Sequence, residues 1–212
     1  MSMRIALVHA LRHSPPPVEA AFAELWPGQQ LMNLLDDSLS ADLAREGALT
    51  PAMTARFLTL ARYAAETGAQ GILFTCSAFG PCIEACAREL APMPVLKPNE
   101  AAIEEAAALG RRIGLLATFP GTLASMPGEF PPGVEVVPCL AEGALAALDA
   151  GDLARHDRLA AEAAFRLRDC DAILLGQFSL ARAAPMVAAA TSRPVVTTPG
   201  SAVRRLRSLL GG

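Results

Sequence analysis

The stretch 71-GILFTCSAFGPC-82 changes character in its middle, from an apolar run to small and polar residues. Residues 71–74 have the length and composition of a buried strand. Gly80 and Pro81 indicate a turn into a helix, because proline is favoured in the first turn of a helix. Cys76 is therefore expected where a strand ends and a helix begins. Its thiol is either buried in the core or catalytic.

Similar apolar runs recur along the chain and alternate with alanine-rich segments of helical character. We expect eight of these runs to be strands, at residues 4–10, 29–36, 71–77, 93–98, 111–118, 134–140, 171–179 and 193–199. Thr50 and Asn99 are suited to cap helices, the first of which opens with Pro51 and stops at Gly68. Strands that alternate with helices predict an α/β fold built on parallel sheets.

The second half of the sequence repeats the first. Three segments have counterparts in the same order: RIALVHA at 4–10 and RIGLLAT at 112–118, GILFTCS at 71–77 and AILLGQF at 172–178, PVLKPNEAAI at 94–103 and PVVTTPGSAV at 194–203. We therefore predict two similar, pseudo-symmetric lobes, each a short parallel sheet flanked by helices. The first lobe is expected at 1–105 and the second at 106–200, with the helix at 201–212 crossing back to the first.

The composition limits the kinds of partner. The 212 residues are 52% hydrophobic and 18% charged, with a net charge of -3, which allows a sizeable core. Seventeen arginines and one lysine are scattered, whereas nucleic acids and anionic membranes select clustered basic residues. The N-terminal apolar run is interrupted by His9 and Arg12, and no apolar run approaches the roughly 18 residues of a membrane span. We expect a cytoplasmic protein that binds neither nucleic acid nor membrane; homo-oligomer formation stays open.

The five cysteines predict neither disulfides nor a metal site. Their number is odd and no export signal accompanies them, so reduced thiols are expected. Cys82 and Cys86 stand one helical turn apart with no second pair or histidine nearby, which is typical of a buried helix face rather than of zinc. The sequence also lacks a GxGxxG motif, and we expect no cofactor.

Ligands of open parallel sheets bind beyond the carboxyl ends of the strands, and a duplicated plan is expected to bring those ends to a cleft between the lobes. Cys76 is one of these strand-end residues. A thiol at a helix N-terminus has a lowered pKa, and the polar neighbours Thr75 and Ser77 favour a chemical role over burial. Phosphatase and thioredoxin sites are excluded, because Cys82 stands where a phosphatase loop needs arginine and no CxxC is present.

Three segments, FTCSAFG at 74–80, IGLLATFPGTLAS at 113–125 and AILLGQFS at 172–179, resemble the aspartate/glutamate/hydantoin racemase superfamily in their order and spacing. That superfamily also contains arylmalonate decarboxylases and maleate isomerases, and the resemblance covers nearly the whole chain. It implies a cofactor-independent enzyme that holds a small carboxylate or amino-acid derivative between the lobes. Thiol groups would then move a proton at the carbon next to the carboxylate.

Cys76 matches the first-lobe thiol of these racemases, and Gln177 stands where they carry the second. Glutamine cannot ionise, so the resemblance implies one catalytic thiol rather than two. A one-thiol site suits decarboxylation followed by protonation, isomerisation through a thioether, or attack on an activated carbon. The superfamily's decarboxylases also use one cysteine, but in the second lobe. The alternative is a catalytically inactive small-anion binding or regulatory protein on the same fold.

ATFPGT at 117–122 resembles the family's carboxylate loop, which implies that Thr118 and Thr122 bind the substrate through hydroxyl and backbone N–H groups. Ser77 and the N–H groups of Ala78 and Phe79 are expected to supply the matching half. A strand-to-helix turn with a threonine cap is the structural alternative.

Two further strand-end residues are candidates. Lys97 is suited to pair with a carboxylate or to act as a base, although a strand-end lysine is more often solvated. His9 is suited to orient or deprotonate Cys76, although it could equally bond a loop carbonyl. Phe79, Phe119 and Phe178 flank the expected site and favour an apolar substituent on the substrate, unless they pack in the core.

Overall fold

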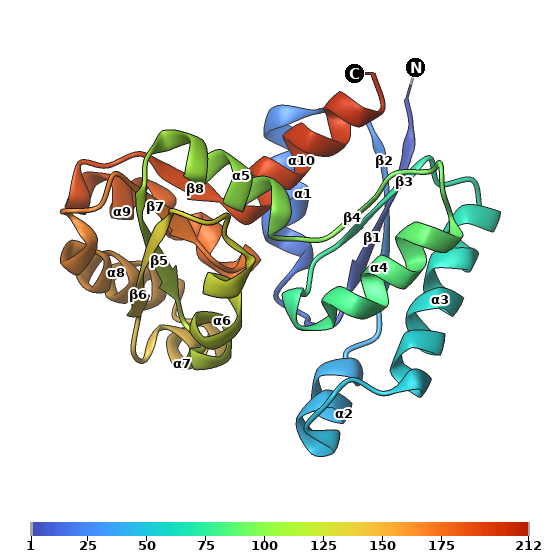
Figure 1. Ribbon diagram of the computed structural model, residues 1–212, viewed down its shortest axis with the longest axis horizontal. Helices are drawn as coiled ribbons and strands as arrows, with labels where there is room; N and C mark the ends of the chain where they lie inside the picture. Colours follow the sequence, from blue (N-terminus) through green and yellow to red (C-terminus); the bar gives the residue numbers. More distant parts are fainter. Residues whose placement is uncertain (1, 212) are drawn as a thin grey trace. The chain divides into compact units, whose positions relative to one another are not determined.

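A computed structural model describes residues 2–211 of the protein. The chain forms two α/β units, each with one parallel sheet of four strands (Figure 1). The first unit runs to Pro98 and resumes at Ala202, and the second spans Asn99–Ser201. The predicted α/β class is confirmed.

In the first unit the sheet order is β2-β1-β3-β4. Its strands are β1 (Arg4–His9), β2 (Gln30–Leu35), β3 (Gly71–Phe74) and β4 (Val95–Leu96). Its helical segments are α1 (Pro15–Leu25), α2 (Leu39–Glu46), α3 (Pro51–Glu66), the 3₁₀ turn η1 (Ser77–Phe79), α4 (Gly80–Glu89) and the later part of α10 (Thr198–Leu209). All four strands fall within segments expected from the sequence.

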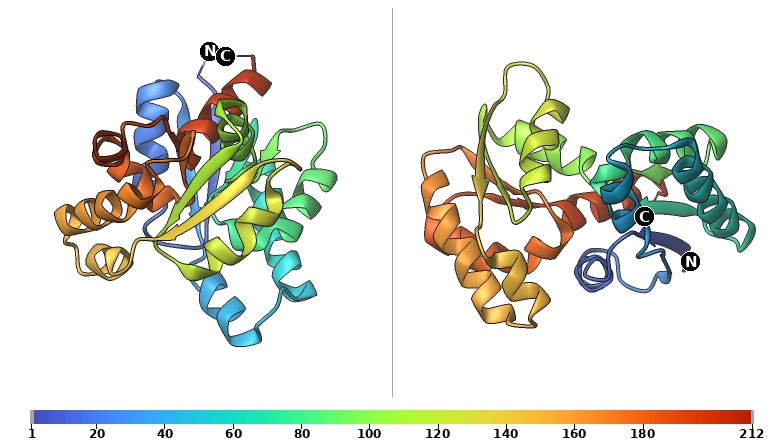
Figure 2. Two further views of the ribbon diagram at one scale, coloured as in Figure 1. Left: turned by 60° about the vertical axis from the view of Figure 1, so that its left-hand side comes forward. Right: turned by 90° about the horizontal axis from the view of Figure 1, so that it is seen from below.

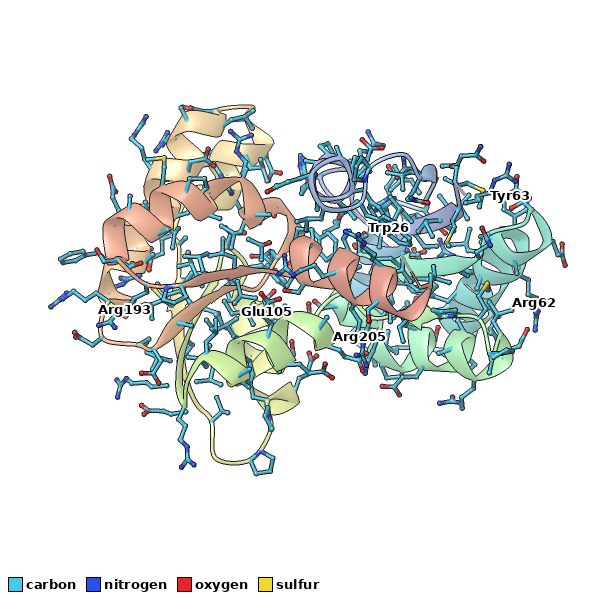
Figure 3. The ribbon with its side chains drawn as sticks, turned by 90° about the horizontal axis from the view of Figure 1, so that it is seen from above. Trp26, Arg62, Tyr63, Glu105, Arg193 and Arg205 are labelled. Carbon is cyan, nitrogen blue, oxygen red and sulfur yellow. The ribbon has the colours of Figure 1, made fainter. Side chains whose placement is uncertain are left out.

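Helices cover both faces of the first sheet (Figure 1). On one face, α3 and α4 pack against alternate residues of β1 and β3, and the ring of Phe57 lies 5.2 Å from that of Phe74. On the other face lie α1 and α10. A Cβ added at Gly71 would stand 3.0 Å from a methyl of Leu206, so the glycine allows α10 to approach the sheet. Trp26, labelled in Figure 3, follows α1 and stacks on Phe22.

In the second unit the sheet order is β6-β5-β7-β8. Its strands are β5 (Arg112–Ala117), β6 (Glu135–Leu140), β7 (Ala172–Leu175) and β8 (Val195–Thr197). Its helical segments are α5 (Glu100–Leu109), α6 (Pro120–Ser125), η2 (Met126–Glu129), α7 (Ala144–Asp149), α8 (Leu153–Ala164), η3 (Phe165–Leu167), η4 (Phe178–Ala183) and α9 (Ala184–Thr191). Helices α8 and α9 cover one face and α5 the other (Figure 2). Across residues 2–211, no helix combines the length and the apolar character that crossing a membrane requires.

The predicted repeat is present at the level of strand register. Val8 of β1 pairs with Phe74 at the end of β3, and Leu116 of β5 pairs with Leu175 at the end of β7. Each of these two central strands leaves its sheet at the same point. Cys76 and Gln177 therefore occupy equivalent places, two residues beyond the last residue of β3 and of β7.

The division between the units falls at Asn99, before α5, whereas the sequence suggested a boundary inside that helix, at 105/106. The reason is packing. Ala102, Ile103 and Ala106 of α5 join the core that contains Ile113 of the second sheet. Residues from Ala202 onwards belong to the first unit, which is where the sequence placed the last helix.

Two helix caps were expected. Thr50 caps α3, with its Oγ1 accepting a hydrogen bond from the Met53 N–H at 3.3 Å. Asn99 does precede α5, but its side chain makes no capping hydrogen bond. Asn99 is instead buried, as the first residue of the second unit.

Candidate functional site

All five cysteines are free thiols, and they differ in exposure. Cys82 and Cys86 lie on the buried face of α4, as the sequence predicted, and Cys139 and Cys170 are buried in the second unit. Burial raises the pKa of Cys86 to about 12, which leaves that thiol protonated and unreactive at neutral pH. Cys76 is the one cysteine that is only partly buried.

Cys76 leaves β3 in an extended conformation and immediately precedes η1. Its sulfur is hydrogen-bonded to the backbone N–H of Ala78 and to the hydroxyl of Ser40. Ser40 lies in the first turn of α2, and its Oγ also donates to the Ala10 carbonyl at 3.0 Å. Sequence analysis did not select Ser40, because it stands far from Cys76 in the chain and no motif marks it.

The expectation of a lowered thiol pKa is wrong. Burial raises the pKa of Cys76, and the hydrogen bonds from Ala78 and Ser40 offset this only in part. The helical turn that follows has three residues, so its dipole is small, whereas the thiolate would lose much of its water. Cys76 is therefore a protonated thiol at neutral pH.

A chain of hydrogen bonds leads from the surface to the residue before Cys76. Asn33 Nδ2 donates to Glu19 Oε1 at 2.6 Å, and Asn33 Oδ1 lies 2.9 Å from His9 Nε2. His9 Nδ1 lies 2.8 Å from Thr75 Oγ1. A carboxylate only accepts, so the amide of Asn33 must present its oxygen to His9. His9 Nε2 therefore carries the hydrogen.

This order of donors defines the state of His9. Burial lowers its pKa, outweighing the opposing effects of Asn33 and Glu19, so the ring is neutral near pH 7. A neutral ring with hydrogen on Nε2 accepts at Nδ1, and Thr75 is the donor. Both ring nitrogens are thus engaged, neither of them with Cys76. In this arrangement His9 bonds the side chain of Thr75, the residue before Cys76, and not the thiol.

The lowered pKa of His9 predicts a stability change in mild acid. The unfolded chain binds a proton at this group near the ordinary value of 6.5, whereas the folded chain resists it. The His9 contribution is therefore complete above pH 6.5 and is lost as the pH falls below it. The free energy of unfolding should drop by up to about 1.4 kcal/mol per pH unit. Urea denaturation between pH 7.5 and 5 would measure this, and His9→Gln should flatten the slope. An unchanged slope would mean that another group dominates.

The other first-unit candidates differ in their surroundings. Ser77 is partly buried and Ala78 is exposed, both beside Cys76. Phe79 is fully buried, with its ring 4.9 Å from that of Phe57, so its side chain belongs to the core. Lys97 Nζ pairs with Glu84 Oε1 of α4 at 2.8 Å, so a carboxylate already neutralises the ammonium.

In the second unit the structure brings Thr118 and Gln177 together. Gln177 Oε1 accepts from the backbone N–H of Thr118 at 2.6 Å and lies 3.0 Å from its hydroxyl. An N–H group can only donate, so the amide must present its oxygen here and its Nε2 elsewhere. Gln177 is partly buried and is held as a hydrogen-bond donor. Thr118, expected to bind a carboxylate directly, bonds this amide oxygen.

The remaining candidates follow β5 and β7. Thr122 is buried in the first turn of α6. The ring of Phe119 is 53% exposed, whereas Phe178 is buried in the core. A Cβ at Gly121 would stand 2.4 Å from the Phe119 ring, so glycine is required for the ring to lie where it does. Of the three phenylalanines expected at the site, Phe119 alone is exposed.

Several solved structures share the fold. An allantoin racemase from Klebsiella pneumoniae has 24% identity and a TM-score of 0.74, over 99% of this chain and 88% of that one. A glutamate racemase from Francisella tularensis subsp. tularensis SCHU S4, in complex with D-glutamate, has 16% identity and a TM-score of 0.71, over 99% and 81%. An aspartate racemase homologue from Pyrococcus horikoshii OT3 has 17% identity and a TM-score of 0.71, over the full length of both chains.

The sequence comparisons define the family. A search of curated proteins gives no significant match. The family model for Asp/Glu/hydantoin racemases matches residues 18–206, which includes both sheets apart from β1. The match spans the segments that carry Cys76, Thr118 and Gln177. The chain belongs to the Asp/Glu/hydantoin racemase family.

Proposed function

We propose that the protein is an enzyme that transfers a proton at the α-carbon of a small carboxylate or amino-acid derivative, without a cofactor and with Cys76 as its catalytic thiol. The observation that carries the proposal is the pair of equivalent strand ends. One presents a partly buried thiol, and the other presents a glutamine fixed as a donor. Membership of the family supports this class of reaction.

A protonated Cys76 suits the delivery of a proton better than its removal. At neutral pH the raised pKa keeps the hydrogen on sulfur, ready for transfer to a carbanion or enediolate carbon. The thiolate left behind would be stabilised by the Ala78 N–H and the Ser40 hydroxyl. Decarboxylation followed by protonation fits this order of events, whereas exchange or isomerisation through a thioether would first require the thiolate.

Gln177 would stabilise negative charge rather than exchange protons. Its oxygen is held by Thr118, so its Nε2 group offers N–H donors to a substrate oxygen. A donor held in place before the reaction stabilises charge that develops on a carboxylate or enediolate oxygen without having to reorganise. In this proposal Cys76 supplies the proton donor and Gln177 supplies a fixed amide. Two-base racemisation would need another ionisable group.

The exposed Phe119 ring favours a substrate with an apolar α-substituent, because apolar surface is buried favourably against an aromatic ring. The neighbouring structures include racemases of allantoin and glutamate, so cyclic ureides and amino acids belong among the compounds tested. The test is an NMR screen in heavy water. Hydantoins, amino acids, dicarboxylates and substituted malonates are incubated with protein, and α-deuterium uptake or loss of carboxylate is followed.

A small-anion binding or regulatory protein is the second candidate. The raised pKa of Cys76 and the non-ionisable Gln177 favour it, because neither group is a ready base. The same NMR samples distinguish the two. Saturation transfer from protein to a compound that undergoes neither exchange nor decarboxylation would support binding without catalysis and would contradict the enzyme.

Thr118→Val tests the role assigned to Gln177. The substitution removes the hydroxyl that bonds Oε1 and keeps the backbone N–H, so one of two anchors is lost. We expect kcat/KM to fall about two- to tenfold, which corresponds to one hydrogen bond of about 0.5–1.5 kcal/mol. Ser125→Ala is the matched control, since it removes a hydroxyl that bonds the Gly121 carbonyl within the neighbouring helix α6. Equal kinetics for Thr118→Val and wild type would contradict the role.

A further inference from the structure

Helix α2 lies at the carboxyl edge of the first sheet, directly after β2 (Figure 1). Its first turn carries Ser40, whose hydroxyl stands between the Ala10 carbonyl and the Cys76 sulfur. Ala10 follows β1 and Cys76 follows β3, so one serine side chain joins the ends of two neighbouring strands. The family resemblance assigned no residue of α2 to the site.

The hydroxyl of Ser40 has one hydrogen and two potential acceptors. While Cys76 is protonated, Ser40 donates to the Ala10 carbonyl at 3.0 Å, and the thiol donates to Ser40 Oγ. When the thiol gives up its proton, the sulfur becomes an acceptor only. A rotation about the Cβ–Oγ bond then turns the Ser40 hydrogen from Ala10 to the sulfur. Hydrogen bonds to ionised groups are roughly twice as strong as neutral ones, so this rotation favours the thiolate.

Ser40 is held in place by ion pairs on both sides of it. Arg56 of α3 donates to Asp42 within α2 at 2.5 Å, and its Nε donates at 3.2 Å to Asp36, which precedes α2. The same guanidinium also bonds Ser38 at 2.6 Å. We call Arg56, Asp36 and Asp42 together the Arg56 clamp. Their side chains are partly shielded from solvent: Arg56 is 34% exposed, Asp36 26% and Asp42 23%.

Helix α3 is a firm support for this clamp. The next residue after Arg56, Phe57, is buried and stacks on Phe74 of β3. The clamp therefore ties α2 to the same core that positions the strand leading to Cys76. Because α2 has only eight residues and a single fully buried side chain, Leu39, its own packing holds it less firmly than α3.

We propose that Ser40 is a catalytic residue that donates its hydroxyl hydrogen to the Cys76 thiolate, and that Arg56 is the positioning residue that keeps Ser40 within reach. The inference rests on the proposed function for the identity of the thiol. Three other titratable groups near this edge are paired or neutral: Asp37 pairs with Arg12, Lys97 pairs with Glu84, and His9 is neutral. Burial opposes ionisation of Cys76, and the neighbours that favour it are Ala78 and Ser40.

The test is the pH profile of iodoacetamide alkylation at Cys76, which needs no substrate. Tryptic cleavage leaves Cys76 in one peptide with Cys82 and Cys86, so tandem mass spectrometry must locate the label. For Ser40→Ala we expect the midpoint to move to higher pH and the rate at pH 7 to fall about threefold. Losing one charge-assisted hydrogen bond lowers the thiolate fraction about tenfold, and the greater nucleophilicity of a more basic thiolate recovers part of this. Ser40→Thr, which keeps the hydroxyl, should retain the wild-type profile.

A double-mutant cycle separates positioning from charge. Arg56→Met also removes a positive charge near the thiol, so its effect alone is ambiguous. If Arg56 acts through Ser40, Arg56→Met should shift the profile in the wild-type background and have little effect in the Ser40→Ala background. Arg62→Met is the matched control, because Arg62, labelled in Figure 3, lies on the same helix. It pairs with Glu89 of α4.

Two results would overturn the inference. An unchanged profile for correctly folded Ser40→Ala, as judged by circular dichroism, would remove Ser40 from the chemistry. Additive effects of Ser40→Ala and Arg56→Met would show that Arg56 acts on the thiol by its charge. Because alkylation is independent of turnover, failure here is distinguishable from failure of the proposed function, which the NMR screen tests.

Discussion

Cys76→Ala should abolish turnover of whichever substrate the NMR screen identifies, with a loss of about 10² to 10⁴-fold, the range of a general acid or base. The alanine side chain has no proton to deliver, and no other cysteine is partly exposed. Cys76→Ser should be similarly impaired, because a hydroxyl is a much weaker acid than a thiol. Deuterium uptake at the α-carbon, or product formation from a malonate, measures the loss.

The fold should survive this substitution. Cys76 lies at the margin of the core and is partly exposed, so removing its sulfur sacrifices little packing. Cys86→Ala is the control, since Cys86 is fully buried and should lower the melting temperature while leaving turnover intact. The reverse pattern, with Cys76→Ala active but several degrees less stable, would show that Cys76 is structural.

Gln177→Cys should add racemisation to a protein that otherwise delivers or exchanges protons on only one face of the α-carbon. Racemisation needs one group to remove the α-proton from one face and another to deliver a proton to the opposite face. Position 177 is the register equivalent of position 76, and the Thr118 groups that now hold Oε1 could stabilise a thiolate there. We expect inversion at least about 10²-fold above background, followed by polarimetry alongside deuterium uptake.

Gln177→Ser is the matched control for this gain. It loses the same amide as Gln177→Cys but gains no ionisable thiol, so any exchange that remains should occur without inversion. Efficient racemisation by the unmodified protein would contradict the one-thiol proposal and would require a second base, with Lys97 and His9 the first residues to examine. Both have assigned partners now, Glu84 for Lys97 and Thr75 with Asn33 for His9.

The sequence by itself determined the fold class, the strands and the duplication. These depend on local composition, because short apolar runs bounded by turn residues form buried strands wherever helical segments separate them. The repeat then placed Cys76 and Gln177 at equivalent strand ends, which the register of β3 and β7 confirms. Cys82 and Cys86 were likewise identified as buried from their spacing.

The boundary between the units depended on tertiary packing. Helix α5 shares a buried core with Ile113 and Leu174 of the second sheet, which assigns it to the second unit. The same holds for the three phenylalanines near the expected site. All three are the same residue type and follow a strand, yet Phe79 and Phe178 are buried and Phe119 is exposed.

Only the tertiary structure decided the chemical state of each site residue. A pKa depends on the water removed and on the donors within a few ångströms, and those come from distant parts of the chain. Cys76 was expected to be acidic from its local sequence, but burial prevails over the hydrogen bonds from Ala78 and Ser40. From the sequence, His9 was suited to act as a base. In the structure both its ring nitrogens are hydrogen-bonded, to Asn33 and to Thr75. Sequence proximity carries no information about such partners, because folding brings them together across β1, β2, β3 and α2.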